Sequence, residues 1–284
     1  MIFDKAAVIG VGLMGASFAL AAKKYGIAQR VSGHGRNRGT LERAVAAGVI
    51  DDYTMDLSEL CRGADLILIA TPVGAFRAIG AAIRPHLKEG AVVCDVGSVK
   101  GALVHDMEFF MPPGVHFVGV HPIKGSETSG FAGASSDFYQ GAKCIVTPTE
   151  HTDKDAMSAV VEAWERIGCR IIYLSPEKHD EIFSLVSHLP HVAAYALVGS
   201  VAVVDKDFIE YGGSGFLDTT RVAMSSAEVW SDICLMNRDN ILQHIDVYIE
   251  RLQRIKRIME AGDDKALKKE FDASGALRSK LKNV

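Results

Sequence analysis

Three glycines near the N-terminus have the spacing of a turn that binds phosphate groups. They form the pattern G-x-G-x-x-G between a short apolar run and an amphipathic segment, as in the strand–turn–helix unit of dinucleotide-binding domains. Gly10 allows the tight turn, Gly12 lets the backbone approach a pyrophosphate, and Gly15 lets the helix pack against the strand. The alternative is that the glycines only form a turn. The residues expected to contact the cofactor are Gly10, Gly12, Leu13, Met14 and Gly15, followed by Thr71, Pro72 and Ser98 after later strands.

The segment after the second predicted strand indicates which dinucleotide is bound. An NAD site usually carries Asp or Glu there to accept hydrogen bonds from the ribose hydroxyls. This sequence has Gly35 at that position, followed by Arg36, Asn37, Arg38 and Thr40. A guanidinium binds a 2′-phosphate through two N–H groups, whereas a carboxylate repels it. We therefore expect NADP to be preferred over NAD, with Arg36, Asn37 and Thr40 at the cofactor; the alternative is that the arginines are solvated loop charges.

Two polar residues follow the fourth and fifth predicted strands. Ser98 lies in the segment 95–101, and His121 lies in the segment 119–130. Because ligands bind beyond the carboxyl ends of the strands in such sheets, both residues are expected to face the reactive ring of the cofactor. A neutral imidazole accepts a proton near neutral pH, so His121 is the first candidate for proton transfer. The alternative is that His121 only caps a strand end.

Two further histidines, His188 and His191, lie in an apolar helical segment where they have no obvious packing role. They are three residues apart and share one helix face, a spacing that also suits a metal ion. The sequence shows no third ligand with partnering geometry, so we expect no metal. We expect His191 to be a core or supporting residue.

The elements that must position these residues fall into two parts. Apolar runs alternate with helical segments in the first part, which predicts a doubly wound, mainly parallel sheet of the Rossmann type. Helical periodicity replaces the strands after residue 174. We therefore expect a dinucleotide-binding domain at 1–174 and an all-helical substrate and dimerisation domain at 175–284. The predicted strands are 6–9, 30–33, 66–70, 91–95, 116–120, 143–147 and 170–174.

One apolar stripe in the helical part predicts a contact between two copies of the chain. Its residues recur at intervals of three and four, so they share one helix face. The alternative is that the stripe packs within its own domain. The apolar stretch 192–204 is too short to span a bilayer, which takes about 20 residues, and is expected to be a buried helix. The residues of the stripe are Ile241, Ile245, Tyr248, Leu252, Ile255 and Met259.

The composition of the chain excludes several classes of protein. The 284 residues carry a formal charge of −4, which argues against a nucleic-acid partner and against an anionic membrane surface. The five cysteines are scattered and no C-x-x-C occurs, as in reduced cytosolic proteins. The N-terminus lacks the basic and apolar regions of a signal peptide. We expect a cytoplasmic protein.

The motifs together resemble one enzyme family over nearly the whole chain. The patterns G-x-G-L-M-G, D-x-G-S-V-K, G-x-H-P-I-x-G-x-E-x-S-G and S-H-L-P-H occur in this order, followed by Asp218-Thr-Thr-Arg221 and Val229-Trp230. This set resembles the prephenate/arogenate (cyclohexadienyl) dehydrogenase family of tyrosine biosynthesis. The resemblance implies an N-terminal dinucleotide domain and a C-terminal helical domain that dimerises.

The resemblance also implies a reaction, the oxidative decarboxylation of prephenate or arogenate with hydride transfer to NAD(P). His121 matches the catalytic histidine that accepts the proton of the ring hydroxyl, and Ser98 matches the serine that hydrogen-bonds this hydroxyl. Arg221 matches the arginine that binds the substrate carboxylate, although it could instead be a structural ion-pair partner. The remaining family positions near the substrate are His188, Glu127 and Trp230.

One position departs from the family pattern, and two other classes of protein compete with it. Leu217 stands where family members often carry lysine, which puts access to the pocket in question. The β-hydroxyacid dehydrogenases share the start G-x-G-x-M-G but use a lysine on a central helix, and no lysine occurs between Lys178 and Lys206. A non-catalytic dinucleotide sensor would not need Ser98, His121 and Arg221 at one crevice.

Overall fold

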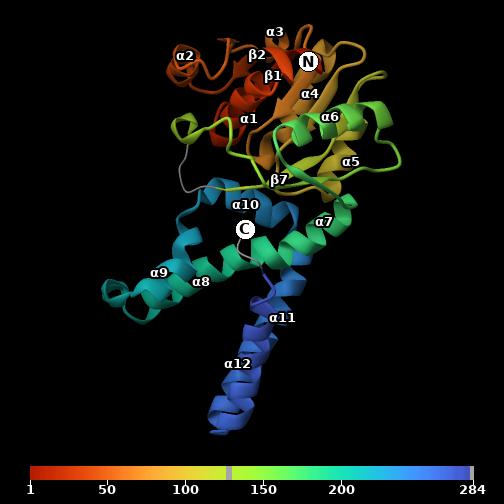
Figure 1. Ribbon diagram of the computed structural model, residues 1–284. Coiled ribbons are helices and arrows are strands. Elements are labelled where there is room, and N and C mark those ends of the chain that lie inside the picture. Colours follow the sequence, from red (N-terminus) through yellow and green to blue (C-terminus); the bar gives the residue numbers. More distant parts are fainter. Residues whose placement is uncertain (126–129, 282–284) are drawn as a thin grey trace.

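The computed structural model describes residues 1–125 and 130–281, and it consists of an α/β part followed by a helical part (Figure 1). The larger sheet has the strand order β3-β2-β1-β4-β5-β6, and every pair in it is parallel. The order reverses between β1 and β4, which creates a crevice beyond the carboxyl ends of these strands. Its strands are β1 (Phe3–Ile9), β2 (Ala28–His34), β3 (Asp52–Tyr53), β4 (Leu66–Ile69), β5 (Val92–Asp95) and β6 (His116–Val118).

Helices cover both faces of this sheet. Successive residues of β1 point to opposite faces, so Val8 packs in one core cluster with Phe18 and Trp164, and Ile9 packs in the other with Phe76. The expected doubly wound parallel sheet is therefore confirmed. The helices of this part are α1 (Leu13–Lys24), α2 (Arg38–Ala46), α3 (Leu57–Cys61), α4 (Phe76–Ile83), α5 (Gly101–Phe110) and α6 (Lys154–Arg166), with short 3-10 turns η1 (Val73–Ala75), η2 (Arg84–His86) and η3 (Phe131–Gly133).

A second, three-stranded sheet was not expected. It contains β7 (Val120–Ile123), β8 (Lys143–Val146) and β9 (Arg170–Tyr173); β7 runs antiparallel to β8, and β8 runs parallel to β9. The single strand predicted at 116–120 is wrong, because the chain leaves the first sheet at Gly119. A Cβ atom on Gly119 would lie 2.4 Å from the Thr147 Oγ1 atom, so this crossing needs glycine. His121 consequently lies inside β7 and not beyond the end of a strand.

One long helix begins the helical part and passes through a π-helical turn. The segments α7 (Pro176–Phe183), η4 (Ser184–His188) and α8 (Leu189–Val204) form a continuous helix of 29 residues. Pro190 has no N–H and its ring crowds the carbonyl group four residues earlier, which favours a wider turn just before it. Shorter helices follow, namely η5 (Lys206–Tyr211), α9 (Ser214–Thr220), η6 (Arg221–Met224), α10 (Ala227–Met236), α11 (Arg238–Glu260) and α12 (Asp264–Arg278).

The long helix does not have the burial expected from the sequence. The stretch 192–204 is largely exposed in the single chain, with Val203 at 87% and Val204 at 74% exposure, so the prediction of a buried helix is wrong. The prediction that this apolar segment is too short to span a bilayer is also wrong. The whole helix Pro176–Val204 is long and apolar enough to cross a membrane, by length and composition. The sequence pattern at 192–204 captured only its second half.

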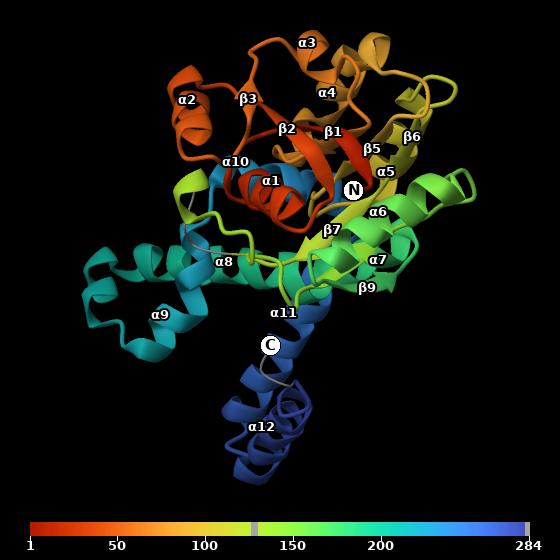
Figure 2. The same ribbon diagram turned by 45° about the horizontal axis from the view of Figure 1, so that its top comes forward.

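The apolar stripe of α11 is also largely uncovered. Helices α11 and α12 form a hairpin that projects away from the rest of the molecule, and both views show this arm clear of the sheets (Figures 1 and 2). Ile241 at the base of the arm is buried, whereas Tyr248, Leu252 and Met259 are 41%, 49% and 63% exposed. Packing within the chain therefore covers the stripe only at the base of the arm and leaves the rest of it exposed.

Candidate active site

The glycine-rich turn has the shape that a dinucleotide needs. Gly10 has φ +102°, and a Cβ atom there would lie 2.5 Å from the carbonyl oxygen of Ala70. A Cβ atom on Gly15 would lie 2.1 Å from the carbonyl oxygen of Gly10, whereas one on Gly12 would meet nothing within 4 Å. Gly12 thus leaves open space in front of α1, whose first turn has no side-chain cap. The residues of this turn fit a pyrophosphate bound at the helix N-terminus.

The loop after β2 places the predicted cofactor residues as follows. Arg36 is highly exposed, and its Nη1 atom lies 3.9 Å from the Oε1 atom of Glu228 on α10. The Asn37 side chain accepts a hydrogen bond from the Thr40 backbone N–H at 3.0 Å, so Asn37 caps α2. Thr71 follows β4 directly beside the glycine-rich turn, with its Cγ2 atom 3.1 Å from a Cβ position on Gly10.

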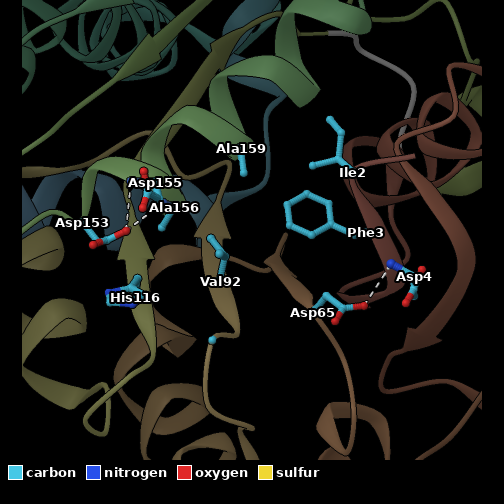
Figure 3. A pocket seen from close by; sticks show the side chains of 11 residues that line it. Ile2, Phe3, Asp4, Asp65, Val92, His116, Asp153, Asp155, Ala156 and Ala159 are labelled. Carbon is cyan, nitrogen blue, oxygen red and sulfur yellow. Dashed lines mark hydrogen bonds between the residues drawn. The ribbon is translucent and has the colours of Figure 1, made fainter.

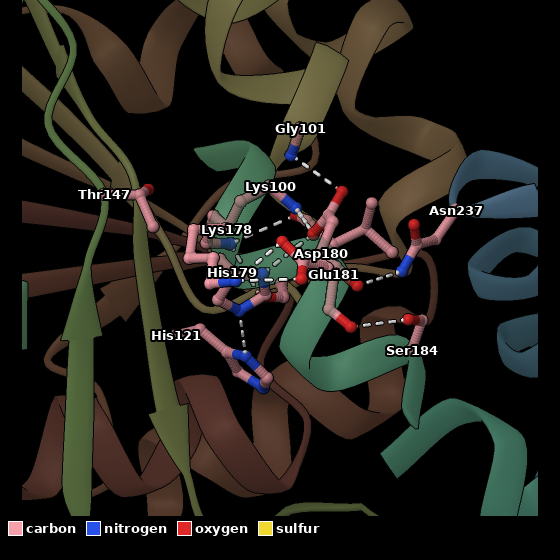
Figure 4. Close-up of polar contacts among 12 residues, drawn as sticks. Lys100, Gly101, His121, Thr147, Lys178, His179, Asp180, Glu181, Ser184 and Asn237 are labelled. Carbon is pink, nitrogen blue, oxygen red and sulfur yellow. Dashed lines mark hydrogen bonds and ion pairs between the residues drawn. The ribbon is translucent and has the colours of Figure 1, made fainter. Parts of the chain in front are cut away.

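His121 is buried and belongs to a chain of hydrogen-bonded groups (Figure 4). Its Nδ1 atom lies 2.8 Å from His179 Nε2, and His179 Nδ1 lies 2.8 Å from Asp180 Oδ1. The Asp180 carboxylate also accepts the backbone N–H groups of Lys100 and Gly101, each at 2.8 Å. These N–H groups begin α5, so the first turn of α5 is bound to α7.

A buried ion pair holds the segment that contains Ser98. Lys100 is fully buried, and its Nζ atom lies 2.7 Å from Asp95 Oδ2. Lys100 also donates to the carbonyl oxygens of Gly97 and Val99, while Asp95 Oδ1 accepts the backbone N–H of Val120. Removing one partner of such a buried pair typically costs about 3–5 kcal/mol. The pair therefore fixes the end of β5 relative to β7.

His188 presents an unpartnered nitrogen. The Asn237 Nδ2 atom donates to the carbonyl oxygen of Asp180 at 2.8 Å and to His188 Nδ1 at 3.1 Å. The proton of a neutral His188 must therefore be on Nε2. Among the described residues this buried Nε2 atom has no hydrogen-bond partner. An unpaired buried donor costs about 1–3 kcal/mol, so a ligand acceptor would stabilise this position.

Two aromatic rings, those of His191 and Trp230, lie beside His188, and the Arg221 guanidinium is nearby. The His191 ring stacks on Trp230 with centroids 3.5 Å apart, and Trp230 presents its edge to His188 at 6.1 Å. Burial lowers the pKa of His191, and the nearby Arg221 guanidinium lowers it further. Ser98 is half-buried, and its backbone opposes the lowering of the His188 pKa. The structure thus gathers these residues, while Glu127 lies outside the described residues.

The buried histidines are held in their neutral forms. Burial lowers the pKa of His121 well below 6.5, with further lowering by His179, Lys100 and His188. Burial lowers the pKa of His179 to about 2 and that of His188 to about 4. A neutral imidazole can accept a proton at one nitrogen and donate a hydrogen bond from the other. The site therefore contains neutral imidazoles at neutral pH, each with one nitrogen that can accept a proton.

Sequence reasoning missed four residues of this cluster, namely Lys100, His179, Asp180 and Asn237. One signal was available, because Asp180, Ser184 and His188 recur at intervals of four and so follow one helix face. The predicted His188 marked that face, and its polar neighbours could have been read from the same spacing. Asn237 offered no such signal, since it reaches His188 from another helix.

The large surface cavity shown in Figure 3 is not part of this site. It has a volume of about 530 Å³ and is lined by Phe3, Val92 and His116 at the amino ends of their strands, together with Asp65 and Asp153. The candidate site lies at the opposite, carboxyl ends of these parallel strands. Within residues 1–125 and 130–281, no group of three or more His, Cys, Asp or Glu side chains could hold a metal ion.

A parallel sheet with this phosphate-binding turn and neutral buried histidines defines a pyridine-nucleotide dehydrogenase with a helical second part. Residues 18–173 match the family model of the prephenate dehydrogenase nucleotide-binding domain, and residues 175–273 match that of the prephenate dehydrogenase dimerization domain. The chain therefore belongs to the prephenate/arogenate dehydrogenase family, which confirms the resemblance of the motifs. It is an oxidoreductase, and the competing β-hydroxyacid dehydrogenase assignment is excluded.

Individual relatives cover nearly the whole chain. The cyclohexadienyl dehydrogenase of Zymomonas mobilis is 35% identical over 99% of this chain and 97% of that protein. The crystal structure of prephenate dehydrogenase from A. aeolicus in complex with hydroxyphenyl propionate and NAD+ has a TM-score of 0.93, 35% identity and 98% coverage of both chains. The Synechocystis arogenate dehydrogenase structure has a TM-score of 0.81 and 28% identity, covering 97% of this chain and 99% of that one.

Acid should destabilise the folded protein through the neutral histidines. The pKa of an unfolded histidine is near 6.5, whereas the pKa values of His179 and His188 are about 2 and about 4 in the fold. The stability they provide is complete above pH 6.5 and is lost as the pH falls toward the folded-state values, at up to about 1.4 kcal/mol per pH unit for each histidine. Urea unfolding at fixed protein concentration, from neutral to mildly acidic pH, measures this slope. The His179→Phe variant should have a shallower slope, and an unchanged slope would contradict a neutral His179.

Proposed function

We propose that this protein catalyses the oxidative decarboxylation of prephenate, arogenate or both, with hydride transfer to NAD(P), as a step of tyrosine biosynthesis. Relatives that span the whole chain carry the names of these activities. The observation that carries the proposal is the pair of buried neutral histidines, His121 and His188, of which His188 presents an unpartnered Nε2–H group. His121 follows Val120, whose backbone N–H donates to Asp95 at the end of β5, and this strand end bounds the crevice expected for the nicotinamide.

The proposed reaction needs a proton acceptor at the ring hydroxyl. Hydride leaves the carbon that bears this hydroxyl, and the hydroxyl proton goes to His121. The bond to the ring carboxylate breaks, its electron pair enters the ring, and carbon dioxide leaves an aromatic phenolate that takes the proton back from His121. The bound nicotinamide supplies the hydride acceptor. Ser98 would hydrogen-bond the hydroxyl and help to orient the cofactor. A neutral imidazole suits the proton transfer, because the hydroxyl becomes acidic as hydride departs.

The helical part would bind the rest of the substrate. Arg221 carries a guanidinium at the start of η6, close enough to lower the pKa of His191, and would bind a substrate carboxylate. His188 would donate its Nε2–H group to a substrate oxygen. Trp230, stacked on His191, would form an aromatic wall beside the ring, and Glu127 would complete the pocket. Leu217, where the family often has lysine, is 61% exposed and supplies no positive charge at its position.

The His121→Asn variant should lower kcat by about 10²-fold or more, because the proton acceptor is lost, while the affinity for the dinucleotide changes little. Purified enzyme is assayed with prephenate and with arogenate, following reduced nicotinamide, and cofactor binding is titrated separately. The His116→Asn variant is the matched control, since His116 lines the distant cavity. Turnover that survives His121→Asn would exclude His121 as the acceptor, and no turnover by the native enzyme with either substrate would favour a non-catalytic sensor.

We also propose that NADP is preferred over NAD. Gly35 stands where NAD sites usually have a carboxylate, and the exposed Arg36 guanidinium is available to a 2′-phosphate. Asn37 and Thr40 at the start of α2 would line the same site. The preference rests on this loop alone, because the A. aeolicus relative was solved with NAD+. Glu228, 3.9 Å from Arg36, would compete with a 2′-phosphate for the guanidinium.

The Arg36→Ala variant should weaken NADP binding by about 10-fold or more and leave NAD binding nearly unchanged, because only NADP carries the charge that Arg36 contacts. The Glu228→Gln variant should favour NADP further, since it removes the competing carboxylate. Dissociation constants for both dinucleotides are measured by fluorescence titration. Arg30→Ala serves as the control, because Arg30 is on the same strand but pairs with Asp52. Equal losses for both cofactors in Arg36→Ala would end the NADP proposal.

We also propose that the protein is cytoplasmic and forms a homodimer. Its two domains would be 1–174 and 175–284. Strand β9 ends at Tyr173 and α7 begins at Pro176, so this division falls between elements. The exposed apolar surfaces of α8 and α11 belong to the segment that matches a dimerization domain. Burial in a second copy would remove them from water. This accounts for the apolar character of the helix Pro176–Val204 without a bilayer.

The Leu252→Glu variant should dissociate the proposed dimer, because a charge in an apolar interface loses its hydration. Sedimentation velocity is expected to give a dimer for the native chain and a monomer for the variant at micromolar concentration. Phe109→Glu is the control, since Phe109 is 83% exposed on α5 in the α/β part. A native protein that sediments as a monomer would refute the proposed dimer.

A further inference from the structure

Two buried polar groups of α7, His179 and Asp180, have no part in the reaction described above. His179 is fully buried, and Asp180 is 4% exposed. Their side chains connect the start of α5 to His121 on β7 (Figure 4). Burying such groups is unfavourable unless they are hydrogen-bonded. The donor and acceptor in each of their hydrogen bonds determine which ring nitrogen of His121 carries the proton.

The Asp180 carboxylate is the acceptor at one end of these hydrogen bonds. Both of its oxygens accept backbone N–H groups, one from Lys100 and one from Gly101, so neither oxygen needs to carry a proton. Burial raises the pKa of Asp180, while these N–H groups and the charge of Lys100 oppose the rise. The N-terminus of α5 further favours the anion. An ionised carboxylate can only accept, so His179 Nδ1 carries the proton of their 2.8 Å hydrogen bond.

This assignment determines the next hydrogen bond. With its proton on Nδ1, a neutral His179 has a lone pair on Nε2. His121 Nδ1, 2.8 Å away, must then be the donor. The lone pair of a neutral His121 is consequently on Nε2. Phe183 stacks on His179 with centroids 4.5 Å apart and also contacts the His121 ring, which restrains both ring planes.

The charged and titratable groups around His121 allow this arrangement. Lys100 is engaged by Asp95 and by two carbonyl oxygens, so its charge is not available to Asp180 as a direct ion pair. His188 on η4 is near enough to lower the pKa of His121, and it stays neutral because burial lowers its own pKa. Asp180 is therefore the anion that reaches His121 through a hydrogen-bonded group.

We propose that His179, held by Asp180, is a positioning residue that keeps the proton of His121 on Nδ1 and leaves its Nε2 atom as the proton acceptor. His179 also accepts a hydrogen bond from the imidazolium that forms when His121 takes up the hydroxyl proton, and Asp180 stabilises that charge from behind. The same logic operates where a carboxylate fixes the tautomer of a catalytic histidine; here a second imidazole is inserted between the two. The inference rests on the proposed role of His121.

The kinetic test compares His179→Phe with His179→Gln. Phenylalanine keeps the stacking on Phe183 but has no acceptor, so kcat should fall about 10- to 100-fold, as for other groups that orient a functional histidine, with little change in KM. The acid limb of the pH–kcat profile should move to lower pH, because His121 loses the partner that stabilises its protonated form. Glutamine has a carbonyl acceptor and should restore most of kcat and the position of the limb.

The control and the contrary outcomes separate this inference from the proposed function. His105→Phe removes another histidine 2.8 Å from a carboxylate, Glu177, but on the exposed face of α5, and should change neither kcat nor the limb. If His121→Asn abolishes turnover while His179→Phe retains full kcat and the same limb, the positioning role is overturned and the proposed function stands. The positioning role is also overturned if His179→Phe loses activity only because part of the protein is unfolded, while the acid limb of the pH–kcat profile stays at the same pH.

A measurement on the native protein applies even if His179→Phe does not fold. Histidine side-chain nitrogens labelled with ¹⁵N distinguish a protonated ring nitrogen from an unprotonated one by chemical shift. The His121 signals, assigned by their loss in His121→Asn, should show Nδ1 protonated and Nε2 unprotonated at neutral pH. A His121 that carries its proton on Nε2 overturns the inference directly.

Discussion

The structure depends on the placement of one carboxylate, that of Asp180, at the start of α5. It accepts the N–H groups of Lys100 and Gly101 and so ties the long helix to the end of the parallel sheet. The contact is tight enough that a Cβ atom on Gly101 would lie 2.6 Å from the carboxylate. The backbone carbonyl of the same residue orients Asn237. The hydrogen bonds that lead to His121 and to His188 thus both start from one residue.

This cluster consists of buried polar side chains. The Lys100–Asp95 pair is fully buried, and so are the rings of His179 and His188. Such groups are stable inside a protein when their hydrogen bonds are made, and they then specify one arrangement of the elements. Here the exception among the described residues is the buried Nε2 atom of His188, which has no hydrogen-bond partner. A buried donor without a partner is unfavourable, so an acceptor atom beside this ring would stabilise the cluster.

The sequence was sufficient for the main sheet and for the glycine-rich turn, because both follow from local rules of periodicity and backbone shape. It was not sufficient for the second sheet, since the change of sheet at Gly119 depends on Thr147 far along the chain. His121 was identified by its type and motif, but its partners His179 and Asp180 come from α7 and only the fold brings them together. The sequence does not predict the exposure of α8, because apolar residues can be covered by a second chain as well as by their own.

The number of residues in the π-helical turn Ser184–His188 determines which way the side chains of the long helix point beyond it. Steps of four residues drift around an ordinary helix, and the wider turn offsets this drift, so His188 returns to the side on which Asp180 lies. Deleting one residue from this turn would rotate everything beyond it by about 100° around the axis. His188 would then leave Asn237, and the outer apolar surface of α8 would turn with it. A substitution in this turn changes one side chain. A deletion would change both the buried hydrogen bonds of His188 and the direction of the apolar surface of α8.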